Sequence, residues 1–157
     1  MKCSEIIFDS NKDYYSKNKS TFDSKIIHKS NLVFIIEDEN ENKFGGYVNA
    51  EIGFTDNQWT TDPRAFLFSL KSNDLLYQPM KFNVSKPSNA FRLYPKSSNR
   101  LFKFGEDEVR IEKKGKKESY CHSYKYYSHY DYNGIENALR GTSGYFIPKR
   151  IVVIQMN

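Results

Sequence analysis

Apolar residues occur along the chain in short runs that polar and turn-forming residues separate. The most apolar run, Asn31–Asp38 (NLVFIIED), is short and nearly continuous, which predicts a strand buried on both faces. A polar turn at Glu39–Asn42 follows, and the next stretch, 43–52, alternates like a strand. The two runs together predict a long antiparallel hairpin.

Similar short runs, separated by turn signals, predict the other strands. A short helix is expected after Ser20, with Phe22, Ile26 and Ile27 on its inner side. The chain lacks the regular alternation of strands and long helices that a doubly wound fold requires. We therefore expect one domain over residues 1–157, mainly β with short helices (α+β), built as a two-layer antiparallel β-sandwich. The expected strands are Ser4–Asp9, Ala65–Leu70, Lys81–Val84, Ala90–Pro95, Arg100–Phe104, Glu108–Lys114 and Lys149–Met156.

Two adjacent glycines, Gly45 and Gly46, interrupt the second strand of the hairpin. Glycine weakens a strand unless another backbone or ring lies too close for a side chain. We expect this strand to be central and to pass beneath large rings, with Ala65–Leu70 as its neighbour. Phe66 and Phe68 would then share one face of that neighbour. The phosphate-binding glycine patterns do not match this stretch.

Composition narrows the class of protein. The aromatic fraction of 16% supplies core volume, and the net charge of +5 is too small to indicate nucleic acid by itself. The first residues lack the apolar segment of a secretory signal, and no run is long enough for a membrane span. With two distant cysteines, Cys3 and Cys121, these features favour a cytoplasmic protein with reduced thiols.

Four motifs occur in a specific order: FGGY at 44–47 after the strand LVFIIED, AFLFSL at 65–70, LFKFGEDEVRI at 101–111 with Gly105, and a closing RIVVIQM. From about Ser4 to Met156 this order resembles the TLDc domain of oxidation-resistance proteins, although the family is often richer in glycine where this chain has FGEDEV. The resemblance implies a β-sandwich with small flanking helices. It also implies a non-enzymatic role in protection against oxidative stress, through protein partners that include the vacuolar-type proton ATPase.

The stretch 119–132 combines six tyrosines with candidate metal ligands. A zinc site would use Cys121, His122 and His129, with the carboxylate of Asp131 as the candidate fourth ligand. Adjacent residues of a strand face opposite ways, however, and no CxxC partner exists. We expect no metal, no cofactor and no catalytic constellation. The alternative in the enzyme class is a thiol-dependent scavenger or enzyme that uses Cys121.

A second alternative is an RNA-binding module formed by residues 113–132. The tyrosines and Lys125 would stack on bases, and the KKGKK run at 113–117 would contact phosphates. Glutamates flank the run, however, and Gly115 suits the tip of a solvated hairpin. We therefore favour the hypothesis of no nucleic-acid partner.

A polar loop, DNQWTTDPR at 56–64, holds the single tryptophan of the chain. Trp59 either anchors the loop to the core or contacts a partner beside Asp62 and Arg64. These three residues are the predicted partner-binding positions, and the oligomeric state stays open.

Overall fold

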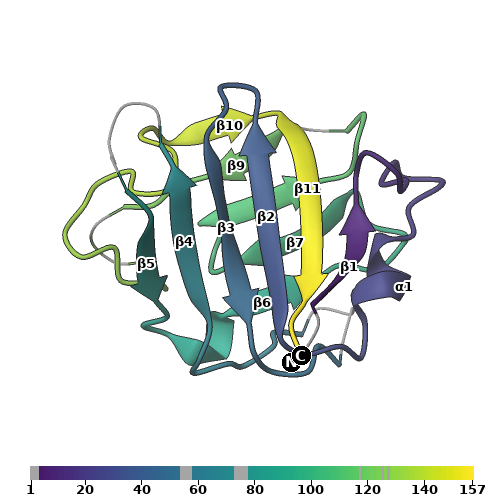
Figure 1. Cartoon of the computed structure of the whole chain (residues 1–157), viewed down its shortest axis with the longest axis horizontal. Coiled ribbons are helices and arrows are strands. Elements are labelled where there is room, and N and C mark those ends of the chain that lie inside the picture. The colour runs from purple at the N-terminus through teal and green to yellow at the C-terminus, as the bar shows by residue number, and fades with distance from the viewer. Residues whose placement is uncertain (1–3, 54–57, 73–77, 117, 125, 127) are drawn as a thin grey trace.

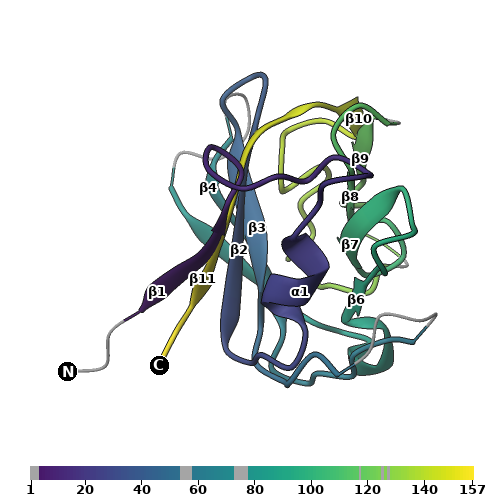
Figure 2. The same ribbon diagram turned by 90° about the vertical axis from the view of Figure 1, so that its right-hand side faces the viewer.

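Two antiparallel β-sheets pack face to face as an open sandwich with little helix (Figures 1 and 2). The computed structural model describes residues 4–53, 58–72, 78–116, 118–124, 126 and 128–157. The six-stranded sheet has the order β1-β11-β2-β3-β4-β5, and the five-stranded sheet has the order β10-β9-β8-β7-β6. The strands are β1 (Glu5–Asp9), β2 (Leu32–Asp38), β3 (Lys43–Val48), β4 (Phe66–Lys71), β5 (Met80–Asn83), β6 (Phe91–Leu93), β7 (Arg100–Phe104), β8 (Val109–Glu112), β9 (Ser119–Cys121), β10 (Gly144–Phe146) and β11 (Pro148–Gln155).

The predicted sandwich is thus confirmed. The expected strands are present within two residues at each end, except that the strand predicted over 43–52 ends at Val48 as β3. The short strand β10 was not expected, because only Ile147 separates it from β11. The expected helix is α1 (Phe22–Ile26), and a 3-10 turn occupies Pro87–Asn89. Ser20 does not occupy the N-cap position, which belongs to Thr21, but its Oγ accepts the Phe22 N–H at 3.3 Å.

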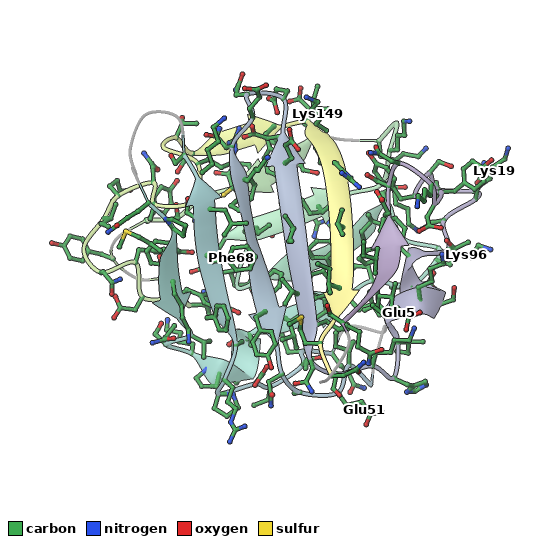
Figure 3. The ribbon with its side chains drawn as sticks, in the orientation of Figure 1. Glu5, Lys19, Glu51, Phe68, Lys96 and Lys149 are labelled. Atoms are coloured by element: carbon green, nitrogen blue, oxygen red, sulfur yellow. The ribbon has the colours of Figure 1, made fainter. Side chains whose placement is uncertain are left out.

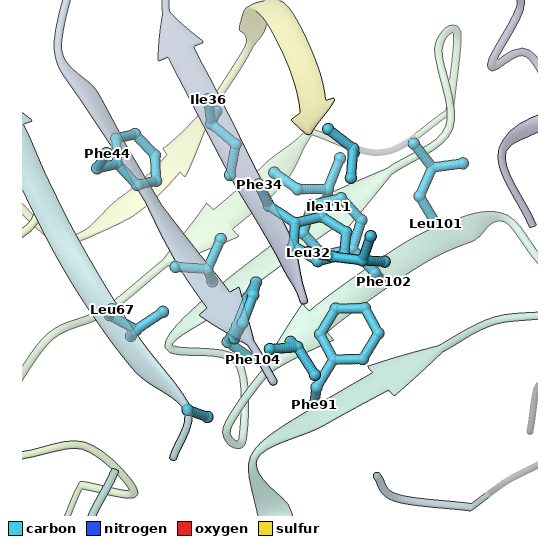
Figure 4. Packing of buried hydrophobic residues seen from close by; sticks show 14 of the residues in the cluster. Leu32, Phe34, Ile36, Phe44, Leu67, Phe91, Leu101, Phe102, Phe104 and Ile111 are labelled. Atoms are coloured by element: carbon cyan, nitrogen blue, oxygen red, sulfur yellow. The ribbon is translucent and has the colours of Figure 1, made fainter. Parts of the chain in front are cut away.

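Large rings fill the space between the sheets (Figure 4). The Phe34 ring of β2 lies at the centre, with its centroid 4.9 Å from that of Phe102 and 5.5 Å from that of Phe104. From α1, Phe22 stacks on Phe102 at 5.3 Å, so the helix closes one open side of the sandwich (Figure 2). The aromatic-rich composition is therefore explained by the core, where phenylalanines from both sheets interlock.

The expectation that β2 is buried on both faces is wrong. Its residues alternate: Leu32, Phe34 and Ile36 are fully buried, whereas Val33 and Ile35 are only partly buried. The five-stranded sheet covers one face of the six-stranded sheet. Among the described residues, no strand or helix covers the other face (Figure 2).

The glycine prediction is confirmed. β3 lies between β2 and β4 in the interior of the sheet, with Gly45 opposite Phe68 and Gly46 opposite Leu67. A Cβ on Gly46 would lie 2.5 Å from Cζ of Phe104, and a Cβ on Gly45 would lie 1.8 Å from the carbonyl oxygen of Phe34. Real Cβ atoms do not approach other atoms so closely, so both positions require glycine for packing.

Gly105 lies in the tight turn between β7 and β8 and has a different reason to be glycine. Its φ of +58° falls in the left-handed region, and a Cβ there would lie 1.5 Å from Oε2 of Glu108. The buried carboxylate of Glu108 accepts the backbone N–H groups of His129 and Tyr130, at 2.5 Å and 3.3 Å. Gly105 therefore makes room for the carboxylate that fastens the 128–130 segment to this turn.

Candidate protein-interaction surface

The predicted partner-binding loop wraps around one end of the sandwich, from one sheet to the other. Thr60 bridges to Phe91 of β6, and the loop then enters β4 of the six-stranded sheet. Asp62 is buried beneath it, and its carboxylate accepts the N–H groups of Asn49 at 2.6 Å, Ala50 at 3.2 Å and Arg64 at 3.0 Å. All the oxygens of Asp62 are thus engaged in holding the loop.

Trp59 and Arg64 lie toward different sheets. The Trp59 ring packs on the ammonium group of Lys103, 4.9 Å from the ring centroid, on the five-stranded sheet. Arg64 is exposed near Tyr47 of β3: burial raises the pKa of the Tyr47 hydroxyl, the Asp62 carboxylate raises it further, and the Arg64 guanidinium lowers it. The three predicted residues are therefore neighbours along the loop but do not form one patch, and partner binding through Trp59 and Arg64 stays a prediction.

The stretch 119–132 separates its candidate ligands. Cys121 of β9 points into the core and is fully buried, whereas the ring of His122 points outward and its Nε2 bonds the carbonyl of Glu106 at 2.9 Å. Burial raises the pKa of the Cys121 thiol to about 12. At neutral pH this thiol is protonated and out of reach of solvent, so it lacks both properties of a reactive thiolate. Cys3 lies outside the described residues.

Across the described part of the chain, no group of three His, Cys, Asp or Glu side chains is arranged to hold a metal ion. Two of the six tyrosines of this stretch fill core positions, and Tyr124 and Tyr126 are exposed. Tyr130 and Tyr132 are buried, and the Tyr130 hydroxyl donates to the carbonyl of Ala90 at 2.7 Å. Tyr120 and Tyr145 meet edge to face on the surface, with centroids 5.1 Å apart.

The KKGKK run forms the predicted hairpin tip between β8 and β9, with Gly115 at a φ of +82°. Lys113 turns inward: its ammonium donates to the carbonyl of Lys96 at 2.6 Å, and burial lowers its pKa. Lys113 is therefore engaged inside the protein and is not presented to a phosphate. Lys117 and Lys125, two further basic residues of the RNA hypothesis, lie outside the described residues.

The outer face of the five-stranded sheet is polar and internally paired. The strand register aligns five outward positions in one row, the charged row: Tyr145, Tyr120, Arg110, Lys103 and Arg92. Arg110 contacts Asp107 at 2.9 Å and Glu112 at 3.0 Å, and Lys103 contacts Glu106 at 3.3 Å. These cations of the row are thus matched by carboxylates of the same sheet and its turns.

The outer face of the six-stranded sheet is apolar over its centre, and sequence reasoning missed it because Asn31–Asp38 was predicted to be buried on both faces. Phe66 and Phe68, predicted to share a face, do so, and both line the same hollow. This face points away from the five-stranded sheet, and Figure 3 labels Phe68 on it. The strand register places neighbours beside them on β2 and β11. We define the outer sheet face as Val33, Ile35, Phe66, Phe68, Leu70, Val152 and Ile154.

A buried ion pair was also missed, because its partners lie 102 residues apart. The carboxylate of Asp38, at the end of β2, accepts a hydrogen bond from Nε of Arg140 at 2.7 Å, and both side chains are buried. The Asp38 carboxylate also accepts the backbone N–H groups of Asn40 and Asn42 in the hairpin turn, each at 2.9 Å, and the side-chain amide of Asn42 at 3.0 Å. The acidic turn at 37–43 therefore has a structural role. Asp38 stabilises the hairpin turn through hydrogen bonds and connects it to the segment before β10 through the ion pair with Arg140.

Comparison with known proteins identifies the family. The family profile of the TLDc domain matches residues 1–136, which include β3 with its two glycines, β4, the Trp59 loop and the Gly105 turn. No individual curated protein matches the chain. The described helices are all too short or too polar to cross a membrane. On the extent of the profile match, the chain belongs to the TLDc domain family, which is linked to oxidation resistance.

Proposed function

We propose that this chain is a non-enzymatic TLDc domain that protects against oxidative stress by binding a protein partner, with the vacuolar-type proton ATPase as the candidate that the family suggests. The observation that carries the proposal is the state of Cys121. A thiol that is fully buried and has a pKa near 12 is a poor nucleophile and a poor oxidant trap. Protection through binding does not need that thiol.

A cytoplasmic location is part of the same proposal. Cys121, the cysteine that the structure describes, is a free thiol, which suits a reducing compartment. The cytoplasm is also where a protein could reach the soluble sector of a proton ATPase. Fractionation of cells that express the tagged chain tests this location.

The decisive experiment removes the thiols. The Cys3→Ser Cys121→Ala variant, checked for an unchanged circular dichroism spectrum, is expressed in oxidant-sensitive cells and compared with the unmodified chain. Alanine is used at 121 because a serine hydroxyl in that apolar site would be left without a partner. Full protection by the variant supports a binding role, whereas loss of protection by a folded variant would favour the scavenger hypothesis.

The partner is tested separately with purified vacuolar-type proton ATPase. Co-sedimentation of the chain with the enzyme, reversed by an excess of untagged chain, is the expected result. If the chain protects cells but does not co-sediment, the ATPase is the wrong partner and the binding role itself stands.

A further inference from the structure

The outer sheet face is rich in apolar side chains, as is typical of a protein surface that another element or partner covers. Antiparallel sheets with one face in water normally place polar residues on that face. Here four successive outward positions of β2 and β11 are Val33, Ile35, Val152 and Ile154, which lie opposite one another, and the charged pair of positions Glu37 and Arg150 follows only at one end. All four are partly exposed, and no described element packs over them (Figures 2 and 3).

The face carries a shallow, open hollow. Phe66, Phe68 and Ile35 frame a hollow of about 430 Å³. Gly45 lies between Ile35 and Phe68 in the strand register and carries no side chain, and Cζ of Phe68 lies 3.0 Å from where its Cβ would be. A hollow of this kind accepts an inserted side chain from another protein. Insertion into a bilayer would instead require apolar side chains that protrude.

Positive charge borders the hollow. Lys81 lines it, with its ammonium 4.3 Å from the Phe66 ring centroid, and Lys43 lines the adjoining depression beside Ile35. Among the described residues, neither lysine has a carboxylate at ion-pair distance. Glu37 lies opposite Lys43 in the strand register, but its carboxylate contacts Lys149, and Arg150 is paired with Asp9. Two unmatched cations on the rim repel a second copy of the same face and attract a partner with carboxylates.

A helix is the element that fits such a face. The backbone groups of the central strands are already paired within the sheet, so a further strand has no place on the face. A helix of about 12 residues is about 18 Å long and reaches across β11, β2, β3 and β4, which are spaced about 4.8 Å apart. Its apolar ridge would cover the partly exposed side chains of this face, which are Val33, Ile35, Phe66, Val152 and Ile154.

We propose that the outer sheet face binds an amphipathic helix of a partner protein whose apolar ridge enters the hollow framed by Ile35, Phe66 and Phe68 and whose flanking carboxylates contact Lys43 and Lys81. The proposal rests on the proposed function, because it names the kind of segment by which the partner is bound.

The test uses synthetic helices and the intact chain with labelled Ile and Val methyl groups. One peptide of about 15 residues has a leucine ridge flanked by glutamates, and its matched control has the same ridge flanked by lysines. Saturable NMR shifts are expected at Val33, Ile35, Val152 and Ile154 with the glutamate peptide, but not with the lysine peptide. The buried Ile36, Ile151 and Val153 serve as internal controls.

Variants assign the contacts. Ile35→Gln is expected to lower the affinity for the glutamate peptide at least about tenfold, since it places an amide in the apolar hollow. Its matched control, Tyr145→Gln on the outer face of the other sheet, leaves affinity within about twofold. The charge reversal Lys43→Glu Lys81→Glu should lower the affinity for the glutamate peptide about tenfold and allow the lysine peptide to bind.

Each other outcome overturns the proposal. Equal binding of the two peptides would exclude a requirement for an acidic partner. If the outer methyl signals shift when the chain is diluted without peptide, the face binds a second copy of the chain. Binding of anionic vesicles that matches the peptide would assign it to a membrane, and no shift up to about 1 mM peptide would leave it without a helix ligand. If the cysteine-free variant still protects cells in any of these cases, the proposed binding role survives and only this surface is wrong.

Discussion

The outer faces of the two sheets are built in opposite ways. The charged row on the five-stranded sheet places Arg110 and Lys103 beside carboxylates of the same sheet and its turns, at 2.9–3.3 Å. The outer sheet face of the six-stranded sheet exposes aliphatic and aromatic side chains around a hollow. One face is complete in the isolated chain. The other has exposed apolar surface that a partner would bury, and this difference directs the search for a binding surface to the six-stranded sheet.

The comparison depends on the two sheets being held rigidly together, and the buried Asp38–Arg140 pair is one of the ties. Arg140→Met removes the cation and leaves the buried Asp38 carboxylate without its strongest partner. We expect a loss of about 3–5 kcal/mol in the free energy of unfolding, measured by urea denaturation. Arg64→Met, the same exchange at an exposed site, should change it by less than about 0.5 kcal/mol. Similar losses in both variants would contradict the role of the pair.

Two adjacent isoleucines of β2 compare the faces directly, because Ile36 points into the core and Ile35 points outward. Ile36→Thr creates a small cavity and buries a hydroxyl, so we expect a loss of about 2–3 kcal/mol. Ile35→Thr keeps its hydroxyl in water and should cost less than about 1 kcal/mol. Equal unfolding midpoints for the two variants would show that the outer face is as closely covered as the core.

The two glycines of β3 face opposite sides of the sheet. Gly46 makes room for the Phe104 ring in the core, and Gly45 makes room for the Phe68 ring on the outer face. Gly46→Val overpacks this contact and should lower the free energy of unfolding by about 1–3 kcal/mol. Gly53→Ala is the matched control, because nothing lies within 4 Å of the added Cβ. The control is expected to be neutral or slightly stabilising. An unchanged midpoint for Gly46→Val would overturn the packing explanation of the FGGY motif.

The smallest expected effect concerns the edge of the outer sheet face, where Arg150 contacts Asp9 at 2.8 Å. The hydrogen bond from Arg150 holds the pKa of Asp9 below its ordinary 3.8, so the pair stabilises the fold above that value and the stabilisation is lost as the pH falls below it. Arg150→Gln should therefore lower the melting temperature at pH 7 and have less effect near pH 2.5. A difference that does not depend on pH would exclude this ionic contribution.

Much of the fold was predictable, because strand formation follows from local apolar runs and turn residues. The reason for Gly45 and Gly46 was also accessible, since glycine inside an aromatic-rich strand points to a close contact. The coverage of β2 was not: a strand of the form LVFII has the same pattern whether a sheet or a partner covers its second face. Nor does the sequence show that the Asp62 carboxylate accepts backbone N–H groups such as that of Asn49, or that Arg140 forms an ion pair with Asp38. These depend on contacts between distant segments.

The central claim is that the chain protects cells through the outer sheet face and not through its thiols. Oxidant survival of cells that express Ile35→Gln, Tyr145→Gln or the Cys3→Ser Cys121→Ala variant tests it in one assay, with equal expression and melting temperature verified for each. The account predicts that Ile35→Gln loses protection, while the Tyr145 variant and the cysteine-free variant retain it. Full protection by Ile35→Gln together with failure of the cysteine-free variant would contradict the account.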